Sequence, residues 1–472
     1  MLSADHHSGR IIASVAATAI ALACGTNYVY SAWAPQFAER LKLSSTESNL
    51  VGLFGNLGMY TFGVPIGIFV DHRGPRPAVL AGSALLAIGY FPLHTAYVQA
   101  VGSVPLLCFF SYLSGLGGCM AFAASVKTSA LNWPHHRGTA TAFPLAAFGL
   151  SAFFFSLIGG LLFPGDPGDF LLFLSCGTCG MALVGFFFLK VYPHPHPHQE
   201  YHAVPESDDP SQPQNLRRSS SEEVKRHRPG GAHVEPDIRG LDLLRNVEFW
   251  QLFLIMGNLA GIGLMTINNI GNNAKALWEH YDDSVDDQFL IGRQQVHVSI
   301  LSTFSFLGRL GSGVGSDILV KKLNASRVWC LVLACFIFFV AQICALNIRE
   351  PHWLFFVSGL SGLGYGFLFG VFPSIVAETF GIKGLSQNWG FMTLAPVLSS
   401  NVFNIFYGQT YDGHSIVKDS GETVCYEGLE CYRAAYWVTF GACLMGVFVV
   451  LWVIRYQRVK HLRESKKGST ED

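Results

Sequence analysis

Twelve long apolar runs dominate the sequence, and each is long enough to cross a lipid bilayer as a helix, which needs about 20 largely apolar residues. In the first half of the chain they lie near residues 11–34, 46–70, 78–98, 103–127, 138–163 and 169–191. In the second half they lie near residues 247–271, 294–316, 327–347, 352–376, 385–408 and 433–456. Lipid offers the backbone no hydrogen-bond partner, so runs of this kind fold as helices. We predict an all-α membrane protein with twelve transmembrane helices.

The charge content supports this prediction. Only 13% of the residues are charged, whereas an average globular chain has about 25%. The lipid bilayer is therefore the expected partner. A formal net charge of −1 gives no reason to expect a nucleic-acid partner. We expect the chain to act as a monomer.

Two short motifs occur once in each half. Gly67 and Asp71 at the end of the second run share their spacing with Gly313 and Asp317 at the end of the eighth. The sequence Ser-Gly-Leu-Gly occurs at 114–117 and again at 361–364, separated by almost the same number of residues. This recurrence predicts two pseudo-symmetric six-helix bundles.

The polar segments divide the chain into five parts. We expect an N-terminal tail at 1–10, the first bundle at 11–192 and the second bundle at 247–456. Between the bundles, 193–246 is rich in Pro, Ser and charge and reads as a disordered linker. Residues 457–472 form a C-terminal tail.

The distribution of Lys and Arg predicts the orientation, because these residues are in excess in cytosolic connections. The even-numbered connections and the C-terminal tail are basic, whereas the odd-numbered connections are short or acidic. Both termini and the linker are therefore expected in the cytosol.

No arrangement of residues typical of an enzyme is present. The sequence has no Walker loop, nucleophile elbow, zinc spacing or metal-binding pair of histidines on one helix. We predict that the chain is not an enzyme and needs no cofactor or metal.

The turn after the second run resembles the signature motif of the major facilitator superfamily. Gly67, Asp71, Gly74 and Arg76 match that motif, whereas His72 and Pro75 replace positions that are usually basic. The resemblance implies a cytoplasmic ion-pair network that holds the outward-facing state. The expected gate residues are Gly67, Asp71, Arg73, Gly74, Arg76, Arg309, Gly313 and Asp317.

Further motifs look like the nodulin-like branch of that superfamily, which is related to monocarboxylate and oxalate/formate transporters. They are Asn132–Gly138, Phe148–Ala152, Ala377–Gly381 and Tyr407–Asp412. Fungal members are often assigned to the vacuolar membrane, so the resemblance implies a vacuolar or plasma-membrane location.

Polar residues inside the runs are candidates for a cargo or proton path, because they are costly in lipid. Asn27, Tyr30 and Ser31 share a helical face, and they either contact cargo or hydrogen-bond between helices. Lys127 either extends to the cytosolic interface or faces the cavity, where it would suit an organic anion.

The second half offers similar alternatives. Asn268 and Asn272 either bind cargo or cap a broken helix, and His297 is either a proton carrier or a structural histidine. Gln387 and Asn388 are further lining candidates.

Two residues have roles that depend on their partners. Arg309, within a run, pairs at the gate with a helix acid or with terminal carbonyls, or it contacts cargo directly. Glu378 is expected to pair with a loop cation. Cys425 and Cys431 in the last outward connection form a disulfide or remain two free thiols.

These features predict a secondary transporter of a small polar or anionic metabolite that works by alternating access, with a proton as a candidate coupling ion. The alternative is a transport-inactive sensor or scaffold with the same fold. A membrane enzyme would need a catalytic pair, and the sequence offers none.

Overall fold

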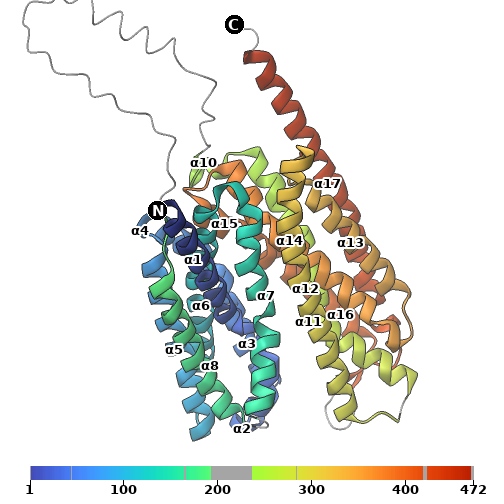
Figure 1. Ribbon diagram of the computed structural model, residues 1–472. Helices are drawn as coiled ribbons and strands as arrows, with labels where there is room; N and C mark the ends of the chain where they lie inside the picture. Colours follow the sequence, from blue (N-terminus) through green and yellow to red (C-terminus); the bar gives the residue numbers. More distant parts are fainter. Residues whose placement is uncertain are drawn as a thin grey trace, which may run out of the picture.

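The computed structural model describes residues 2–43, 45–163, 166–192, 237–282, 284–417 and 423–468. These residues form two bundles of helices side by side (Figure 1). A short antiparallel hairpin, β1 (Ile416–Val417) with β2 (Thr423–Val424), lies between α16 and α17.

The first bundle contains the helices of the N-terminal half. They are α1 (Leu2–Cys24), η1 (Thr26–Val29), α2 (Tyr30–Leu41), α3 (Ser45–Thr61), α4 (Gly63–Arg73), α5 (Pro75–Gln99), α6 (Val104–Asn132), η2 (Pro134–His136), α7 (Arg137–Leu162) and α8 (Pro167–Phe188).

The second bundle contains the helices of the C-terminal half. They are α10 (Leu241–Leu244), α11 (Val247–Tyr281), α12 (Asp287–Leu323), α13 (Trp329–Asn347), η3 (Pro351–Trp353), α14 (Phe355–Phe380), α15 (Leu385–Met392), α16 (Leu394–Gly413) and α17 (Glu430–Gly468).

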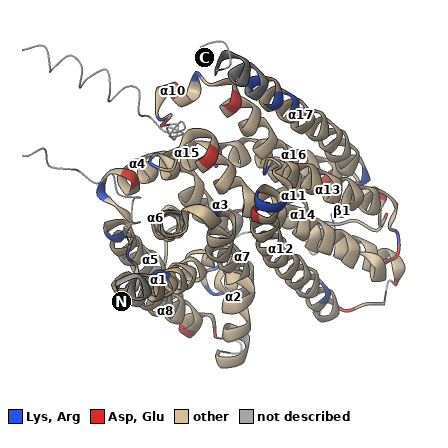
Figure 2. Ribbon diagram, turned by 45° about the horizontal axis from the view of Figure 1, so that its top comes forward, with Lys and Arg blue, Asp and Glu red and all other residues tan. Residues whose placement is uncertain are grey.

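All twelve expected spans correspond to helices. Among the described residues, nine helices are long and apolar enough to cross a membrane, and α3 with α4 makes a tenth span bent by 43°. The remaining two spans are α12 and the pair α15–α16. Charged residues are marked mainly near helix ends and in connections (Figure 2). Large apolar side chains on the outer faces are exposed, as lipid contact requires; Phe187 and Phe448 are each 72% exposed.

Three spans that the sequence suggested were continuous are broken. The first breaks at Gly25, between α1 and η1. Pro65 cannot donate a hydrogen bond to the Thr61 carbonyl, and α3 ends at Thr61. Pro396 has the same effect on the carbonyl of Met392, the last residue of α15.

The boundaries of the polar segments also differ from expectation. α1 begins at Leu2 and α17 continues to Gly468, so helix extends into both expected tails. Residues 193–236 of the linker lie outside the described residues. The segment 237–246, which we expected to be disordered, is bound to the second bundle: the Ile238 amide donates to the Phe380 carbonyl at 2.9 Å. Leu243 is fully buried in the core of that bundle.

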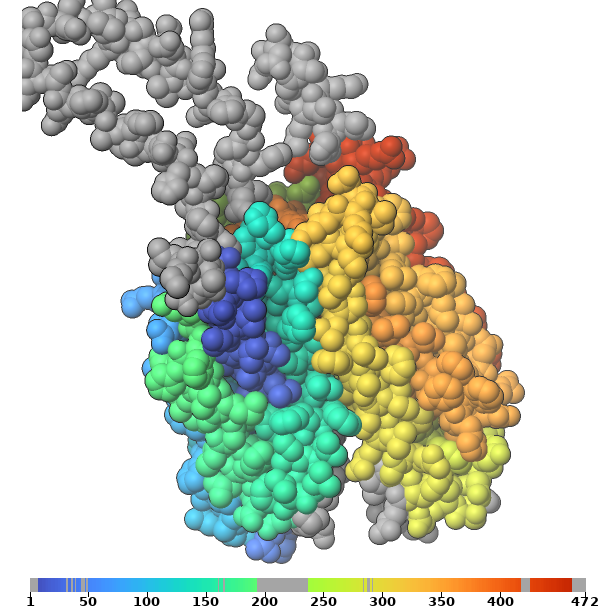
Figure 3. Space-filling model, in the orientation of Figure 1, coloured from blue at the N-terminus to red at the C-terminus, as the bar shows by residue number. Residues whose placement is uncertain are grey.

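The two bundles contact each other along α7 with α12 and along α4 with α15. Their surfaces touch over the upper part of the molecule and separate toward the bottom (Figure 3). The described end of the linker and the end of α17 both lie at the top (Figure 1). We call this side the linker end.

Candidate functional site

At the linker end, Asp71 caps a helix of the opposite bundle. Asp71 is in the last turn of α4, and its carboxylate accepts hydrogen bonds from the amides of Ser386 (3.2 Å) and Gln387 (2.9 Å). These amides belong to the first turn of α15, whose own preceding residue, Gly384, has no side chain to cap them. Gly67, one turn before Asp71, lets the two backbones approach, because a Cβ there would collide with Ser386.

A buried lysine neutralises Asp71. Lys127 of α6 forms an ion pair with Asp71, and the two side chains are only 7% and 3% exposed. The Lys127 ammonium also donates to the Lys383 carbonyl of the second bundle at 3.2 Å. This pair therefore joins three segments from both bundles.

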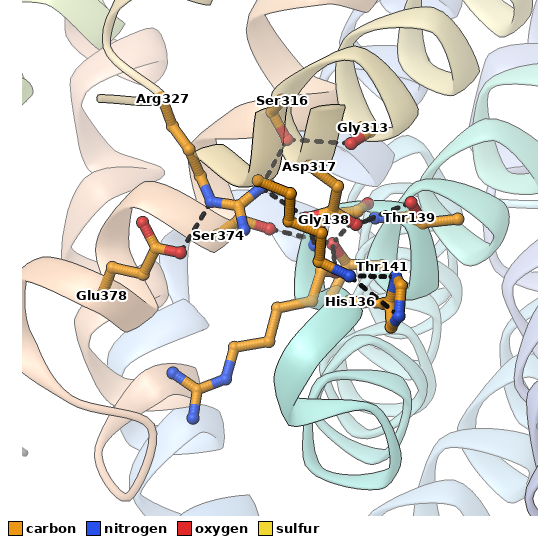
Figure 4. Close-up of polar contacts among 12 residues, drawn as sticks. His136, Gly138, Thr139, Thr141, Gly313, Ser316, Asp317, Arg327, Ser374 and Glu378 are labelled. Carbon is orange, nitrogen blue, oxygen red and sulfur yellow. Dashed lines mark hydrogen bonds and ion pairs between the residues drawn. The ribbon is translucent and has the colours of Figure 1, made fainter. Parts of the chain in front are cut away.

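Asp317 makes the matching contact in the other direction. It lies near the end of α12 and accepts from the amides of Gly138 (3.2 Å) and Thr139 (2.7 Å) in the first turn of α7. The Thr139 hydroxyl donates to the same carboxylate at 2.6 Å. Figure 4 shows Asp317 between Thr139 and Arg327. Gly313, one turn before Asp317, packs against Gly138 and Ala142 of α7.

Arg327 supplies the counter-charge at this second position. Its guanidinium contacts Asp317 at 2.7 Å and Glu378 at 2.7 Å, and it donates to the Ser316 hydroxyl at 2.6 Å. The loop cation expected for Glu378 is therefore Arg327. Each bundle thus uses the aspartate of its Gly-x-x-x-Asp motif to cap a helix of the other bundle.

The cations that pair with Asp71 and Asp317 are not the ones that the sequence indicated. Asp71 pairs with Lys127, whereas Arg76 lies over the Phe186 ring of its own bundle at 4.7 Å and Arg73 is exposed at the end of α4. Gly74 has a φ of +85°, a backbone conformation that explains why glycine occupies this position. Lys127, expected either at the interface or in the cargo path, lies in the contact between the two bundles.

Gln387 and Asn388 also belong to the linker end. The Gln387 amide donates to Asp71, and the Asn388 side chain donates to the Ile238 carbonyl at 2.9 Å. Their expected role as cargo-lining residues has no support in these contacts.

Next to the Asp71 contact, a cavity of about 40 Å³ lies between the bundles, and Ser386 is one of its lining residues. Aromatic side chains from both bundles form much of its wall. They include Tyr28, Tyr60, Phe122 and Phe148 of the first bundle and Tyr365, Phe369 and Trp389 of the second. The volume suits water molecules rather than a metabolite, so a cargo requires the bundles to move apart.

Arg309 is the one charged side chain among the described residues that line this cavity. It is 4% exposed, and its Nη1 donates to the Leu145 carbonyl of α7 at 2.5 Å. Its Nε is buried without a partner. The guanidinium lies over the rings of Phe148, Tyr365 and Phe369 at 5.7–6.0 Å.

The expected gate partners of Arg309 are a helix acid or terminal carbonyls. Among the described residues no carboxylate forms an ion pair with it, and its carbonyl partner, Leu145, lies inside α7 rather than at a helix end. The sequence identified this arginine but not the tyrosines around it. Tyr28 and Tyr60 share a hydrogen bond, and Tyr28 directly follows Asn27, one of the candidates that the sequence offered.

Asn27 and Tyr30 make contacts within the first bundle. Asn27 donates to the Gly55 carbonyl at 3.1 Å and accepts from the Ser114 hydroxyl at 3.2 Å. Tyr30 packs on Trp33, with ring centroids 4.7 Å apart. These contacts support the interhelical alternative. The side chain of Ser31 lies outside the described residues.

In α11, alternate asparagines behave differently. Asn269 donates to Asn404 at 2.7 Å and Asn273 donates to the Tyr436 hydroxyl at 2.7 Å, whereas Asn268 and Asn272 are exposed. All four lie within the continuous helix α11, so the broken-helix alternative is wrong.

His297 is buried in the second bundle and hydrogen-bonds the Ser358 hydroxyl at 2.9 Å. It is not among the described residues that line the cavity.

Cys425 and Cys431 are joined in a disulfide, with their Cα atoms 6.1 Å apart. The bond closes the connection between α16 and α17.

A sequence profile described as the Major Facilitator Superfamily matches residues 16–400. The chain belongs to the major facilitator superfamily. The predicted fold of twelve transmembrane helices in two bundles is confirmed, and the chain is a multi-pass membrane transporter of this superfamily.

Two relatives of similar length come from fungi. The Saccharomyces cerevisiae protein described as "Uncharacterized membrane protein YMR155W" is 28% identical, and the match covers 96% of this chain and 95% of that protein. The "Probable transporter MCH1" of Gibberella zeae is 26% identical, covering 94% of this chain and 89% of its own length.

Solved structures share the superfamily fold. The proton:xylose symporter XylE matches with a TM-score of 0.62 and 15% identity, over 96% of both chains. The Escherichia coli fucose:proton symporter FucP matches with a TM-score of 0.57 and 14% identity, over 93% of this chain and 99% of that one.

Proposed function

We propose that this superfamily member is a secondary transporter of a small organic anion of the monocarboxylate kind, and that Arg309 binds the anion. The observation that carries the proposal is a buried guanidinium facing a central cavity with no carboxylate partner among the described residues. An unpaired charge in a low-dielectric interior costs roughly several kcal/mol, and an anionic cargo would offset that cost.

The rest of the cavity wall suits a compact organic anion. Its aromatic rings can cover an apolar body, and the hydroxyls of Tyr28, Tyr60 and Tyr365 can hydrogen-bond a carboxylate if the bond between Tyr28 and Tyr60 is exchanged for one to the cargo. One fixed positive charge matches one carboxylate. A dicarboxylate would leave one negative charge unpaired among the described lining residues.

The two aspartate contacts provide the gate. Asp71 and Asp317 fasten the bundles together at the linker end, and a rocking motion that opens this end must break both contacts. Their release and reformation would alternate access to the Arg309 cavity. We place the linker end in the cytosol, because Arg73, Arg76, Arg137 and Lys321 gather there, and we propose a vacuolar or plasma-membrane location.

The test is uptake into liposomes that contain the purified protein. Labelled pyruvate and benzoate are the probes, and glucose is the neutral comparison. We expect saturable uptake of the monoanions, abolished by Arg309→Gln and weakened by Arg309→Lys, which keeps the charge but not the planar fork.

Arg137→Gln is the matched control, because Arg137 lies at the start of α7 and is not among the described residues that line the cavity. Equal uptake by wild-type protein and Arg309→Gln would contradict the proposed anion site. Absence of flux for every probe, with tight binding retained, would favour the sensor alternative.

A further inference from the structure

Gly149 of α7 lies directly against the Arg309 guanidinium. A Cβ at this position would lie 3.1 Å from the guanidinium carbon and 3.2 Å from both Nε and Nη1. Those distances are shorter than ordinary van der Waals contact. The glycine therefore leaves a surface of bare backbone on which the planar group of Arg309 rests.

The neighbouring residues of α7 complete this surface, which we call the α7 platform: Leu145, Phe148 and Gly149. The Leu145 carbonyl, one turn before Gly149, accepts the hydrogen bond from Nη1 at 2.5 Å. The Phe148 ring faces the guanidinium from 5.8 Å. Arg309 belongs to the second bundle and the platform to the first, so the contact joins the two bundles beside the cavity.

The platform also packs against Gly25, the residue that follows α1. Gly25 lies at the break after α1, and a Cβ there would lie 2.5 Å from the Phe148 carbonyl oxygen and 2.7 Å from the Ser151 Cβ. The segment Phe148–Ala152, which the sequence singled out, thus has two contacts: Gly149 faces Arg309, and Phe148 with Ser151 faces Gly25. Tyr28, three residues after Gly25, lines the same cavity.

We propose that Gly149 is a positioning residue that lets the α7 platform hold the Arg309 guanidinium while the cavity is empty, and that an incoming anion must draw Arg309 away from this platform. The inference rests on the proposed function, in which Arg309 binds the anion. The platform and the cargo then compete for one guanidinium. A weaker platform should therefore give tighter cargo binding, which is the opposite of what damage to a binding site produces.

Gly149→Ala tests whether a weaker platform gives tighter cargo binding. The added methyl group should displace the guanidinium by a few tenths of an ångström and weaken its charge-assisted hydrogen bond to Leu145. We expect the dissociation constant for benzoate, measured on purified full-length protein, to fall by about threefold to tenfold, as partial loss of such a bond implies. Gly180→Ala is the matched control, because no atom lies within 4 Å of its added Cβ and the constant should not change.

Unchanged or weaker benzoate binding by folded Gly149→Ala overturns the inference while leaving the anion site intact, provided that Arg309→Gln abolishes binding. If wild-type protein and Arg309→Gln show equal binding of benzoate and pyruvate, or none, the proposed function fails and the inference with it.

A second measurement covers the case in which Gly149→Ala does not fold. Structures of wild-type protein with and without benzoate should show the Arg309 Nη1 bonded to the Leu145 carbonyl only in the empty state. A benzoate-bound structure that keeps this hydrogen bond overturns the inference.

Discussion

Lys127 and Asp71 form an ion pair from which water is almost fully excluded. Breaking a buried pair by removing one partner costs about 3–5 kcal/mol, because the other charge is left uncompensated. We expect Asp71→Asn to lower the thermal midpoint of the detergent-solubilised protein clearly. Asp169→Asn, at an exposed carboxylate in the first turn of α8, should leave it nearly unchanged.

Restoring the balance of charge should recover part of that loss. The double variant Asp71→Asn with Lys127→Met removes both charges, and we expect a midpoint above that of Asp71→Asn alone. If Asp71→Asn and the double variant have equal midpoints, an unpaired Lys127 does not destabilise the protein, and this prediction is wrong.

Thr139→Val removes the hydroxyl that donates to Asp317 and keeps the side-chain shape. Hydrogen bonds to charged groups contribute about 1.5–3 kcal/mol. Since this bond joins α7 to α12, the linker end should open more readily. We expect faster maleimide labelling of a cysteine introduced at Ser374, which lies in α14 and hydrogen-bonds Thr141 of α7. Thr95→Val is the control, because that exposed hydroxyl bonds only to a carbonyl of its own helix.

The Cys425–Cys431 disulfide predicts resistance of these thiols to labelling. Without reductant, mass spectrometry should find neither cysteine modified by a maleimide. The double variant Cys425→Ser with Cys431→Ser should lose about 2 kcal/mol of stability, the amount typical of a short closed loop. Labelling of both cysteines in unreduced protein would support the alternative of free thiols.

His297 offers a test of proton coupling. Its ring bonds Ser358 within the second bundle and does not line the cavity, so we expect His297→Gln to keep the pH dependence of uptake shown by wild-type protein. The measurement is benzoate uptake across a range of external pH. Loss of the pH dependence in folded His297→Gln would instead assign the proton to this histidine.

The parts of the fold that could be predicted from sequence depend on local patterns. Apolar length identified the spans, and a repeated spacing identified Asp71 and Asp317 before any contact was known. The breaks at Thr61 and Met392 accompany Pro65 and Pro396, but the prolines alone could not locate them, because Pro92, Pro144 and Pro373 lie inside continuous helices.

The partners of these residues could not be predicted in the same way. Lys127 is 56 residues from Asp71, and only the packing of α6 beside α4 brings them together. Arg309 and Leu145 are 164 residues apart and belong to different bundles. Sequence periodicity places a residue on a face of its own helix, but it does not say which helix lies opposite that face.

The reciprocal capping by Asp71 and Asp317 has a consequence for either bundle expressed alone. In the first bundle alone, two amides in the first turn of α7 would have no acceptor. In the second bundle alone, two amides in the first turn of α15 would have no acceptor. Each isolated half would also contain an aspartate, Asp71 or Asp317, whose carboxylate has lost the helix amides that donate to it. Co-expressed halves should therefore find one another in the membrane, since each completes what the other lacks.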